Sequence, residues 1–255
     1  MEKAARKAAP RLRRDFNEVD ALQVSRKGPA DFVSNADRAA EQAIGEVLMH
    51  ARPDWGLVME ESGERIGNDD QARWIVDPLD GTTNFLHGMP HFAISIAAEV
   101  HGEVVAGLVH QPLTGESFWA EKGRGAWLSD RRLRVSARRE LPDCVIATGI
   151  PFHGHGKTTE FSNILSAIMP EVAGVRRFGS AALDLAWVAA GRFDGYWEAG
   201  LKHWDVAAGI LLVREAGGFV TDYRGGDNMI ARAEIVAANS DIQSKLHRIV
   251  AGAVR

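Results

Sequence analysis

Residues 74–84 read Trp-Ile-Val-Asp-Pro-Leu-Asp-Gly-Thr-Thr-Asn, a short apolar strand that runs directly into two carboxylates. Pro78 favours an extended backbone, so we expect Asp77 and Asp80 to face one site rather than to diverge around a helix. The main-chain carbonyl of Leu79, between them, would add a further oxygen donor. This stretch therefore predicts a cluster of oxygen ligands at the end of a buried strand.

The next residues predict an anion site beside that cluster. Gly81-Thr82-Thr83 allows backbone N–H groups to approach an anion closely, most effectively where a helix begins. Phosphoryl transfer depends on charge neutralisation and on positioning, so cation ligands next to a phosphate cradle suit that reaction.

Two more acidic groupings stand where a chain normally places apolar or neutral residues. Glu60 and Glu61 directly follow the apolar residues 57–59, and Asp205 follows Trp204 at the start of an apolar helix. Several carboxylates that meet at one point repel each other unless a cation neutralises them. An all-oxygen donor set favours a hard cation, and Mg²⁺ is the commonest one that also handles phosphate.

Each grouping alone has an ordinary explanation. Glu60 and Glu61 would form a solvated turn, Asp205 would be a helix N-cap, and Asp37 would complete a capping box with Ser34. Their occurrence together in one chain favours the metal site.

The totals exclude several classes of protein. The chain has 255 residues, of which 45% are apolar and 25% charged, as in an ordinary globular protein. A net charge of −4 gives no reason to expect direct nucleic-acid binding. Cys144 is the only cysteine, which excludes an intramolecular disulfide and fits a reducing cytoplasm. No apolar run approaches the roughly 20 residues of a membrane span, so no membrane partner is expected.

The N-terminal segment is rich in Arg and Lys and poor in acidic residues after Glu2, as transit peptides are. We favour an ordinary first helix with an irregularity at Pro10, because apolar residues recur at helical spacing. These apolar residues are Ala5, Ala8, Ala9, Leu12, Phe16 and Val19.

The remaining pattern predicts one domain over residues 1–255, with an α+β half over about 1–140 and an α/β half over about 141–255. Strands are expected over 74–76, 93–100, 103–110, 117–120, 126–128, 145–148, 194–198 and 219–221, and helices over 161–168, 182–190, 206–216 and 242–251. His101-Gly102 should form the turn of a hairpin. The first half of the chain is rich in hairpin strands, and in the second half strands alternate with helices. This pattern indicates layered α and β structure with two sheets.

Long motifs in the chain resemble those of the inositol monophosphatase family. Residues 77–85 are similar to its first signature, and residues 204–209, followed by Glu-Ala-Gly-Gly at 215–218, are similar to its second. Glu60-Glu61-Ser62 and the segment 27–33 that leads to Asp37 extend the resemblance. Residues 179–184 and 195–198 look most like the bacterial members, and the match covers nearly the whole chain.

The resemblance implies a layered αβαβα fold, a homodimer, Mg²⁺ ions between the sheets and inhibition by lithium. Glu60, Asp77 and the Leu79 carbonyl would hold the first ion. Asp77, Asp80 and Asp205 would hold the second. Thr82, paired with Asp37, would orient and deprotonate the attacking water.

The same resemblance assigns the substrate contacts. Gly81 and Thr82 would bind the phosphate, and Glu198 would accept hydrogen bonds from ring hydroxyls, with Asp205 contributing to sugar contact. The polyol would also meet Gly179, Ser180, Ala181 and Ala182. These roles imply hydrolysis of inositol 1-phosphate or a related sugar or polyol phosphate.

Two features depart from the pattern or lie outside it. Met59 stands where the family commonly has glycine, which affects the shape of the loop around the first metal. Residues 149–157 match no substrate contact. The two histidines of that segment, His153 and His155, fit a surface loop better than a metal site, since no third soft ligand accompanies them.

Alternative functions remain open from sequence. Within the fold they are fructose-1,6-bisphosphatase, histidinol-phosphate phosphatase and 3′-phosphoadenosine phosphatase activities, which a few loop contacts can set. Outside catalysis, a bacterial relative could act as a regulatory partner of the transcription machinery. The intact set of acidic ligands favours the enzyme.

Overall fold

The computed structural model describes residues 1–18, 24–28, 31–151 and 157–254. Several predicted features therefore lie outside the described residues: Val19 of the first helix, residues 29 and 30 of the segment 27–33, and residues 152–156, which include His153 and His155. The backbone of Ser34 is described, but its side chain is not.

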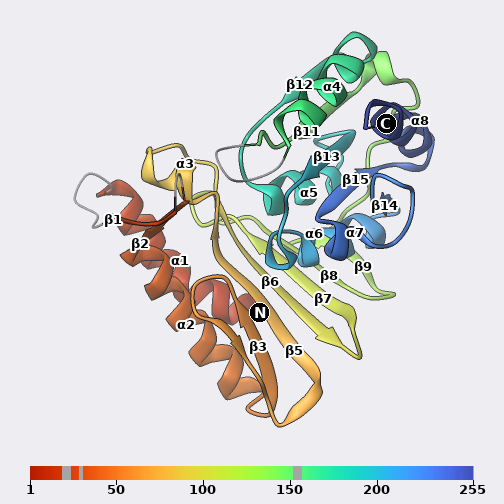
Figure 1. The fold of residues 1–255 in the computed structure, drawn as a ribbon. Helices are drawn as coiled ribbons and strands as arrows, with labels where there is room; N and C mark the ends of the chain where they lie inside the picture. Colours follow the sequence, from red (N-terminus) through yellow and green to blue (C-terminus); the bar gives the residue numbers. More distant parts are fainter. Residues whose placement is uncertain (19–23, 29–30, 152–156, 255) are drawn as a thin grey trace.

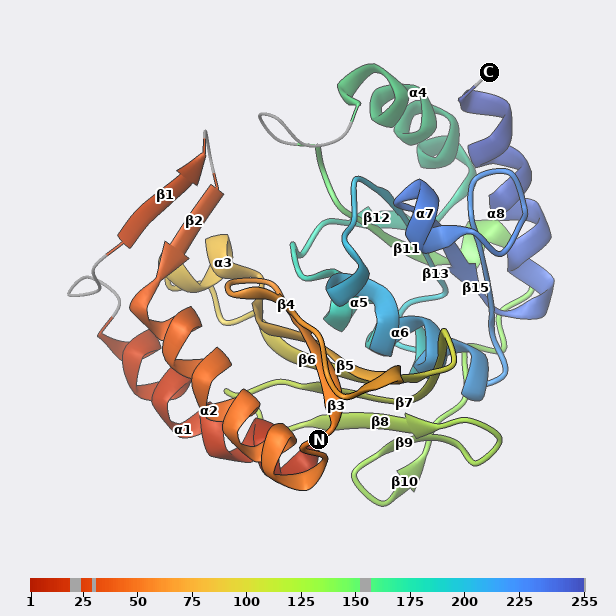
Figure 2. The same ribbon diagram turned by 60° about the horizontal axis from the view of Figure 1, so that its bottom comes forward.

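Helical and sheet layers alternate through the molecule (Figures 1 and 2). The first helical layer is α1 (Glu2–Asn17) and α2 (Asn35–Ala51), the middle one is α5 (Ala181–Ala189) and α6 (His203–Glu215), and the last is α4 (Thr158–Ile168) and α8 (Ser240–Ala253). The large sheet separates the first two layers, and the smaller sheet separates the last two. The expected αβαβα fold is confirmed.

The large sheet has eight strands in the order β10-β9-β8-β7-β6-β5-β3-β4. Its strands are β3 (Trp55–Met59), β4 (Gly63–Arg65), β5 (Asp69–Asp80), β6 (Ala93–Val100), β7 (Glu103–His110), β8 (Ser117–Glu121), β9 (Gly125–Leu128) and β10 (Arg131–Arg132). All neighbours pair antiparallel except β3 and β5. His101 and Gly102 both have positive φ, 53° and 76°, and turn the chain between β6 and β7 as expected.

The smaller sheet has the order β12-β11-β13-β15-β14. Its strands are β11 (Val145–Thr148), β12 (Gly174–Arg176), β13 (Gly195–Ala199), β14 (Phe219–Thr221) and β15 (Glu234–Ala238). β11 pairs in parallel with β12 and β13, whereas β15 runs antiparallel to both its neighbours. The remaining elements are short: β1 (Val24–Gly28) and β2 (Asp31–Ser34), which pair with each other, α3 (Thr82–Leu86), α7 (Met229–Arg232), and single 3₁₀ turns at Leu141–Asp143 and Met169–Glu171.

The buried apolar residues explain why the layers stack in this way. α1 and α2 bury one face each against the large sheet, with Leu12, Ile44 and Leu48 fully covered. α5 and α6 are covered almost all round because each lies between two sheets, so nearly all their buried residues are apolar and several are alanine. α1 stays helical through Pro10, and the expected first helix is confirmed as part of this core.

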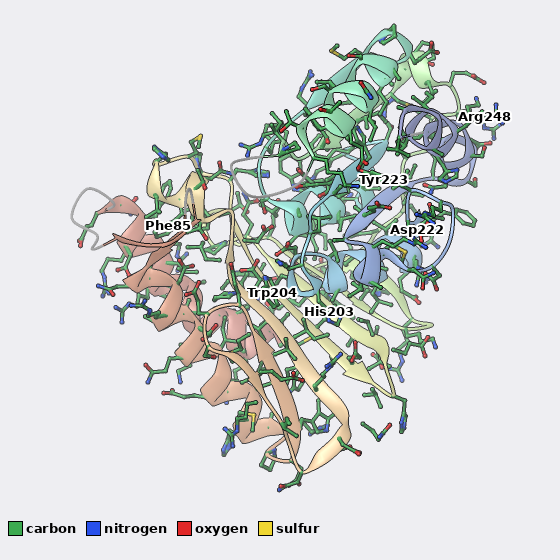
Figure 3. The ribbon with its side chains drawn as sticks, in the orientation of Figure 1. Phe85, His203, Trp204, Asp222, Tyr223 and Arg248 are labelled. Atoms are coloured by element: carbon green, nitrogen blue, oxygen red, sulfur yellow. The ribbon has the colours of Figure 1, made fainter. Side chains whose placement is uncertain are left out.

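One close contact sets the distance between the middle helices and the large sheet. A Cβ at Gly107 of β7 would lie 2.9 Å from Cα of Ala208 in α6, so only glycine allows this approach. The first turn of α6 is anchored to the same sheet: Ser95 Oγ donates to the Trp204 carbonyl at 3.1 Å, and His203 Nε2 lies 3.5 Å from Glu99 Oε2 (Figure 3). The start of α6 is thereby held against β6. No helix in the described ranges is both long and apolar enough to cross a membrane.

Candidate active site

A β-bulge at the end of β5 aims two carboxylates toward one site. Asp77 pairs with Ser95 and Asp80 pairs with Ala93, so three residue steps on β5 face two steps on β6. In a regular strand, side chains three apart point to opposite faces, and one extra residue reverses that relation. An extended backbone at Pro78 would therefore have separated Asp77 from Asp80. The bulge supplies the common direction that the sequence analysis attributed to Pro78.

Two other carboxylates reach the same place from separate elements. Glu60 follows β3, and its N–H donates to the Val76 carbonyl of β5 at 3.3 Å. Asp205 lies in the first turn of α6 rather than at its N-cap, and Asp205 Oδ2 accepts the Lys202 N–H at 2.7 Å. The Asp205 carboxylate therefore caps the first turn of α6 and also belongs to the acidic group.

The charges of these four groups act on one another. Burial raises the pKa of Asp77 well above its ordinary value, and the neighbouring charges of Glu60, Asp80 and Asp205 raise it further. The pKa of Asp205 is also raised well above its ordinary value, by burial and then by Asp80, with smaller effects of Glu60 and Glu198. Burial raises the pKa of Asp80 to about 6, although hydrogen bonds from Ser180 and main-chain N–H groups oppose the shift. The predicted ligands thus form one repelling group.

The donor set fits a hard divalent cation. Buried carboxylates of one sign are costly unless they are protonated or share a cation, and all the donors here are oxygens. Within the described ranges, no three His, Cys, Asp or Glu side chains already stand in a ligating arrangement. Asp77 Oδ1 accepts the Leu79 N–H at 2.9 Å, and the Leu79 carbonyl accepts the Thr82 hydroxyl at 3.0 Å, which leaves that carbonyl a second lone pair.

The predicted anion cradle brings two distant segments together. Gly81 has φ of +97°, and a Cβ there would lie 3.0 Å from the His91 carbonyl and 3.3 Å from the Gly179 carbonyl. Gly179 itself has φ of +82°. Both positions therefore need glycine for their backbone conformation, and Gly81 also needs it for close approach. Thr82 opens α3 directly after this contact.

The segment predicted to meet the substrate is hydrogen-bonded to Asp80. Ser180 Oγ and the Ala182 N–H donate to Asp80 Oδ2, at 2.6 and 2.7 Å. Ala181 begins α5 beside them, and its main-chain N–H also acts on Asp80. In this structure these donors orient a predicted metal ligand.

The structure places Glu198 on the smaller sheet and Asp37 on α2. Glu198, near the end of β13, accepts the hydroxyl of the fully buried Tyr196. Burial raises the pKa of Glu198 to about 7. Asp37 is buried in the first turn of α2. The pairing of Asp37 with Thr82 stays a prediction.

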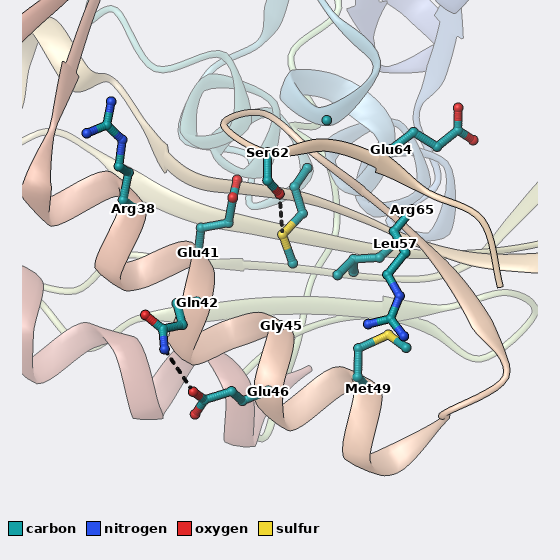
Figure 4. A pocket seen from close by; sticks show the side chains of 12 residues that line it. Arg38, Glu41, Gln42, Gly45, Glu46, Met49, Leu57, Ser62, Glu64 and Arg65 are labelled. Atoms are coloured by element: carbon teal, nitrogen blue, oxygen red, sulfur yellow. Dashed lines mark hydrogen bonds between the residues drawn. The ribbon is translucent and has the colours of Figure 1, made fainter.

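The loop that carries Glu60 and Glu61 rests on α2. The Glu61 N–H donates to Glu41 Oε2 of α2 at 2.8 Å, and the Ser62 hydroxyl lies 3.7 Å from Met59 Sδ (Figure 4). Met59 is buried against Gly45, where a Cβ would meet the Met59 terminal methyl at 2.8 Å. Gly45 makes room for the side chain that replaces the usual glycine at position 59.

Two structural features of the site escaped sequence reasoning. Asn84 Nδ2 donates to the carbonyls of His91 and Phe178, both at 2.7 Å, and so joins the loop after α3 to the segment before α5. Asn84 ends the quoted stretch of residues 74–84, so its position was a usable signal. The second feature is Asp184, which is buried 3.9 Å from His91; it ends the family-like segment 179–184, but the sequence assigned it no role.

Comparisons with known proteins find relatives along nearly the whole chain. A model of the inositol monophosphatase family matches residues 1–255. The chain is 56% identical over 250 residues to an inositol-1-monophosphatase of Mesorhizobium japonicum, covering 98% of this chain and 94% of that protein. It is 47% identical over 237 residues to the Nus factor SuhB of Escherichia coli, covering 93% and 89%.

Solved structures are similar along nearly the whole chain. The extragenic suppressor protein SuhB of Bartonella henselae is 58% identical and superposes with a TM-score of 0.95, covering 97% of this chain and 95% of that one. An IMPase of Thermotoga maritima is 34% identical with a TM-score of 0.89, covering 99% and 96%.

Proposed function

The chain belongs to the inositol monophosphatase family of phosphatases, and from this premise we propose that it is a Mg²⁺-dependent enzyme that hydrolyses inositol 1-phosphate or a related polyol phosphate. The observation that carries the proposal is the convergence of Glu60, Asp77, Asp80 and Asp205 beside the glycine contact of the anion cradle. A phosphate ester seated there would have its anion next to the cation site.

The chain's own residues divide the work. Glu60, Asp77, the Leu79 carbonyl, Asp80 and Asp205 would hold Mg²⁺. Bound Mg²⁺ supplies Lewis acidity, which neutralises phosphate charge and makes hydroxide available near neutral pH.

Water activation and phosphate binding would fall to neighbouring residues. Thr82, with Asp37, would orient the attacking water and pass on its proton. The backbone at Gly81 and Thr82 would bind the phosphate oxygens. The Ser180 hydroxyl and the Ala182 N–H fix the direction of Asp80.

The alcohol part of the substrate would meet Glu198 and the segment 179–182. A carboxylate that accepts hydrogen bonds suits a polyhydroxylated ring. Arg177 is the cation whose charge lowers the pKa of Glu198, and no added basic cluster for a second phosphate accompanies it in the sequence. This favours a monophosphate of a polyol over a bisphosphate.

Phosphate release from inositol 1-phosphate, with and without Mg²⁺, tests the proposal. Wild type should be active only with Mg²⁺, and Asp80→Asn should lose about 100-fold or more, because a charged ligand is replaced by a neutral one. Asp143→Asn, at an exposed position, is the matched control and should keep full activity. Assays of fructose 1,6-bisphosphate, histidinol phosphate and 3′-phosphoadenosine in parallel rank the substrates. Activity of Asp80→Asn equal to wild type would overturn the metal assignment.

We also propose, from the family resemblance, a cytoplasmic homodimer that millimolar lithium inhibits. Sedimentation gives the subunit number, and unchanged turnover in lithium would contradict the inhibition. The E. coli relative named as a Nus factor supports a second role with the transcription machinery. Retention of such a complex by Asp80→Asn would separate that role from catalysis.

A further inference from the structure

Glu198 is held on one side by a residue of its own strand. Tyr196 lies two positions earlier on β13, so both side chains point to the same face of the sheet. The Tyr196 hydroxyl is buried and donates to Glu198 Oε2. Glu198 Oε2 therefore accepts a hydrogen bond from Tyr196, whereas Glu198 Oε1 does not.

The other side of the Glu198 carboxylate rests on Gly149. β11 and β13 pair in parallel with Thr148 opposite Trp197, which brings the next residues, Gly149 and Glu198, alongside each other. A Cβ at Gly149 would lie 1.9 Å from Oε1, 2.0 Å from Cδ and 2.3 Å from Oε2 of Glu198. Gly149 does not have positive φ, so close approach of the carboxylate, and no backbone strain, requires the glycine.

Charge supports the same arrangement. Burial raises the pKa of Glu198 to about 7, the Tyr196 hydrogen bond opposes that rise, Asp80 adds to it and Arg177 lowers it. Without the Tyr196 hydroxyl, Glu198 would be more often protonated at neutral pH, and a neutral acid accepts hydrogen bonds less strongly than a carboxylate.

We propose that Gly149 and Tyr196 form a seat that fixes Glu198 as a hydrogen-bond acceptor and thereby sets the preference for polyhydroxylated phosphate esters. Both are positioning residues, and neither needs to touch the substrate. The inference rests on the proposed function and assigns a role to the first residue of segment 149–157, which no motif explained.

Two variants disturb the seat in different ways. Tyr196→Phe removes only the hydroxyl. Gly149→Ala displaces the end of a flexible side chain, so the fold can accommodate it by moving Glu198. The chain's other tyrosine gives a matched control: the Tyr223 hydroxyl also feels the charge of Glu198 but is buried without a hydrogen bond in the described structure, so Tyr223→Phe should leave the preference between the two substrates unchanged. Gly252→Ala, with open space around it and no positive φ, is the control for the glycine.

The test compares inositol 1-phosphate with p-nitrophenyl phosphate, which has no ring hydroxyls. In both variants kcat/KM for inositol 1-phosphate should fall about 10-fold or more, mainly through KM, because charge-assisted contacts to ring hydroxyls weaken. Hydrolysis of p-nitrophenyl phosphate should stay within about twofold of wild type. An equal fall of kcat/KM on both substrates in an active enzyme, or no fall on either, would contradict the role proposed for Gly149 and Tyr196.

A readout without turnover separates this inference from the proposed function. If the wild-type protein hydrolyses none of the phosphate esters, the proposed function is contradicted, but the inference about Glu198 is not. Calorimetric titration with inositol 1-phosphate then decides about the seat. About 10-fold weaker binding to both variants supports it, and an unchanged Kd overturns it.

Discussion

His91 and Asp184 are buried together among aromatic rings. His91 Nε2 lies 3.9 Å from Asp184 Oδ1, and none of these polar atoms has a hydrogen bond in the described structure. The ring of Phe178 lies 4.9 Å from that of His91, and the ring of Trp187 lies 5.1 Å away and nearly perpendicular. Burial lowers the pKa of His91 to about 4 and raises that of Asp184 well above its ordinary value. Both side chains therefore favour their neutral forms.

This burial should make stability depend on pH through His91. Because the folded-state pKa of about 4 lies below the ordinary 6.5, the unfolded chain binds a proton that the folded chain refuses, and stability falls as pH drops through that window. Between about pH 7.5 and about pH 5 this costs roughly 2 kcal/mol of unfolding free energy. His91→Phe, which suits the aromatic surroundings, should remove that loss in urea titrations at the two pH values.

The matched control is His50→Gln, at an exposed position on α2, which should keep the wild-type pH dependence. Asp184, whose raised pKa acts in the opposite direction, is present in all three proteins, and burial, the largest cause of its shift, persists in His91→Phe. Identical pH slopes for wild type and His91→Phe would contradict the prediction.

At the scale of elements, Asn84 connects two loops that approach the site from opposite sheets. It is buried and donates to one carbonyl in each loop, and the second loop continues into Ser180, which binds Asp80. Asn84→Ala should cost about 1–3 kcal/mol of stability, because the carbonyls of His91 and Phe178 both lose their donor. It should also raise the Mg²⁺ concentration needed for half-maximal activity.

Urea unfolding and a Mg²⁺ activation curve check both parts of that expectation. Asn163→Ala, at an exposed position of α4, is the control. Wild-type stability together with a wild-type activation curve in Asn84→Ala would show that the loops hold their places without this side chain.

The contact between Gly45 of α2 and Met59 of β3 predicts that substitutions at these two positions are energetically coupled. Glycine inside a helix costs about 1 kcal/mol relative to alanine, but Gly45→Ala would push the Met59 methyl from its place. In wild type the two effects should roughly cancel. In the Met59→Ala background, Gly45→Ala should stabilise the protein by about 1 kcal/mol. Thermal unfolding of the four proteins measures this coupling, and additive effects would contradict it.

Helices and strands with a clear hydrophobic periodicity, or with glycine at a turn or helix end, were predictable from sequence. Elements without these signals were not. The hairpin at His101-Gly102 and the stop of α6 at Gly217 follow from turn chemistry. β15 was missed, although it lies inside the smaller sheet, because its apolar residues are buried on both faces and show no alternation. The bulge in β5 was also missed, since it depends on which residues of β6 lie opposite Asp77 and Asp80.

At the scale of the whole molecule, the site joins parts of the chain that only tertiary structure brings together. Glu60, Asp77 and Asp80 come from the large sheet, whereas Asp205 comes from the middle helical layer and Glu198 from the smaller sheet. The sequence indicated the acidic residues through their unusual places after apolar runs. It did not indicate the roles of Tyr196 and Gly149, because each acts through a partner that pairing and packing place beside it.

Repulsion among these carboxylates should make the whole fold respond to Mg²⁺. Asp77 is buried beside Glu60, Asp80 and Asp205, so without a cation their charges oppose the packing of α6 against the large sheet. Asp77→Asn keeps the shape of the side chain and the oxygen that accepts the Leu79 N–H.

In the presence of a chelator, Asp77→Asn should therefore unfold a few degrees above wild type, corresponding to about 1–2 kcal/mol. Added Mg²⁺ should raise the unfolding temperature of wild type strongly and that of the variant little, since ligand binding stabilises only a protein that binds it. Scanning calorimetry with Asp143→Asn as control measures both effects. Equal Mg²⁺ responses in wild type and Asp77→Asn would place the cation elsewhere, whereas a variant less stable than wild type in the chelator would mean that Asp77 stabilises the fold without any ion.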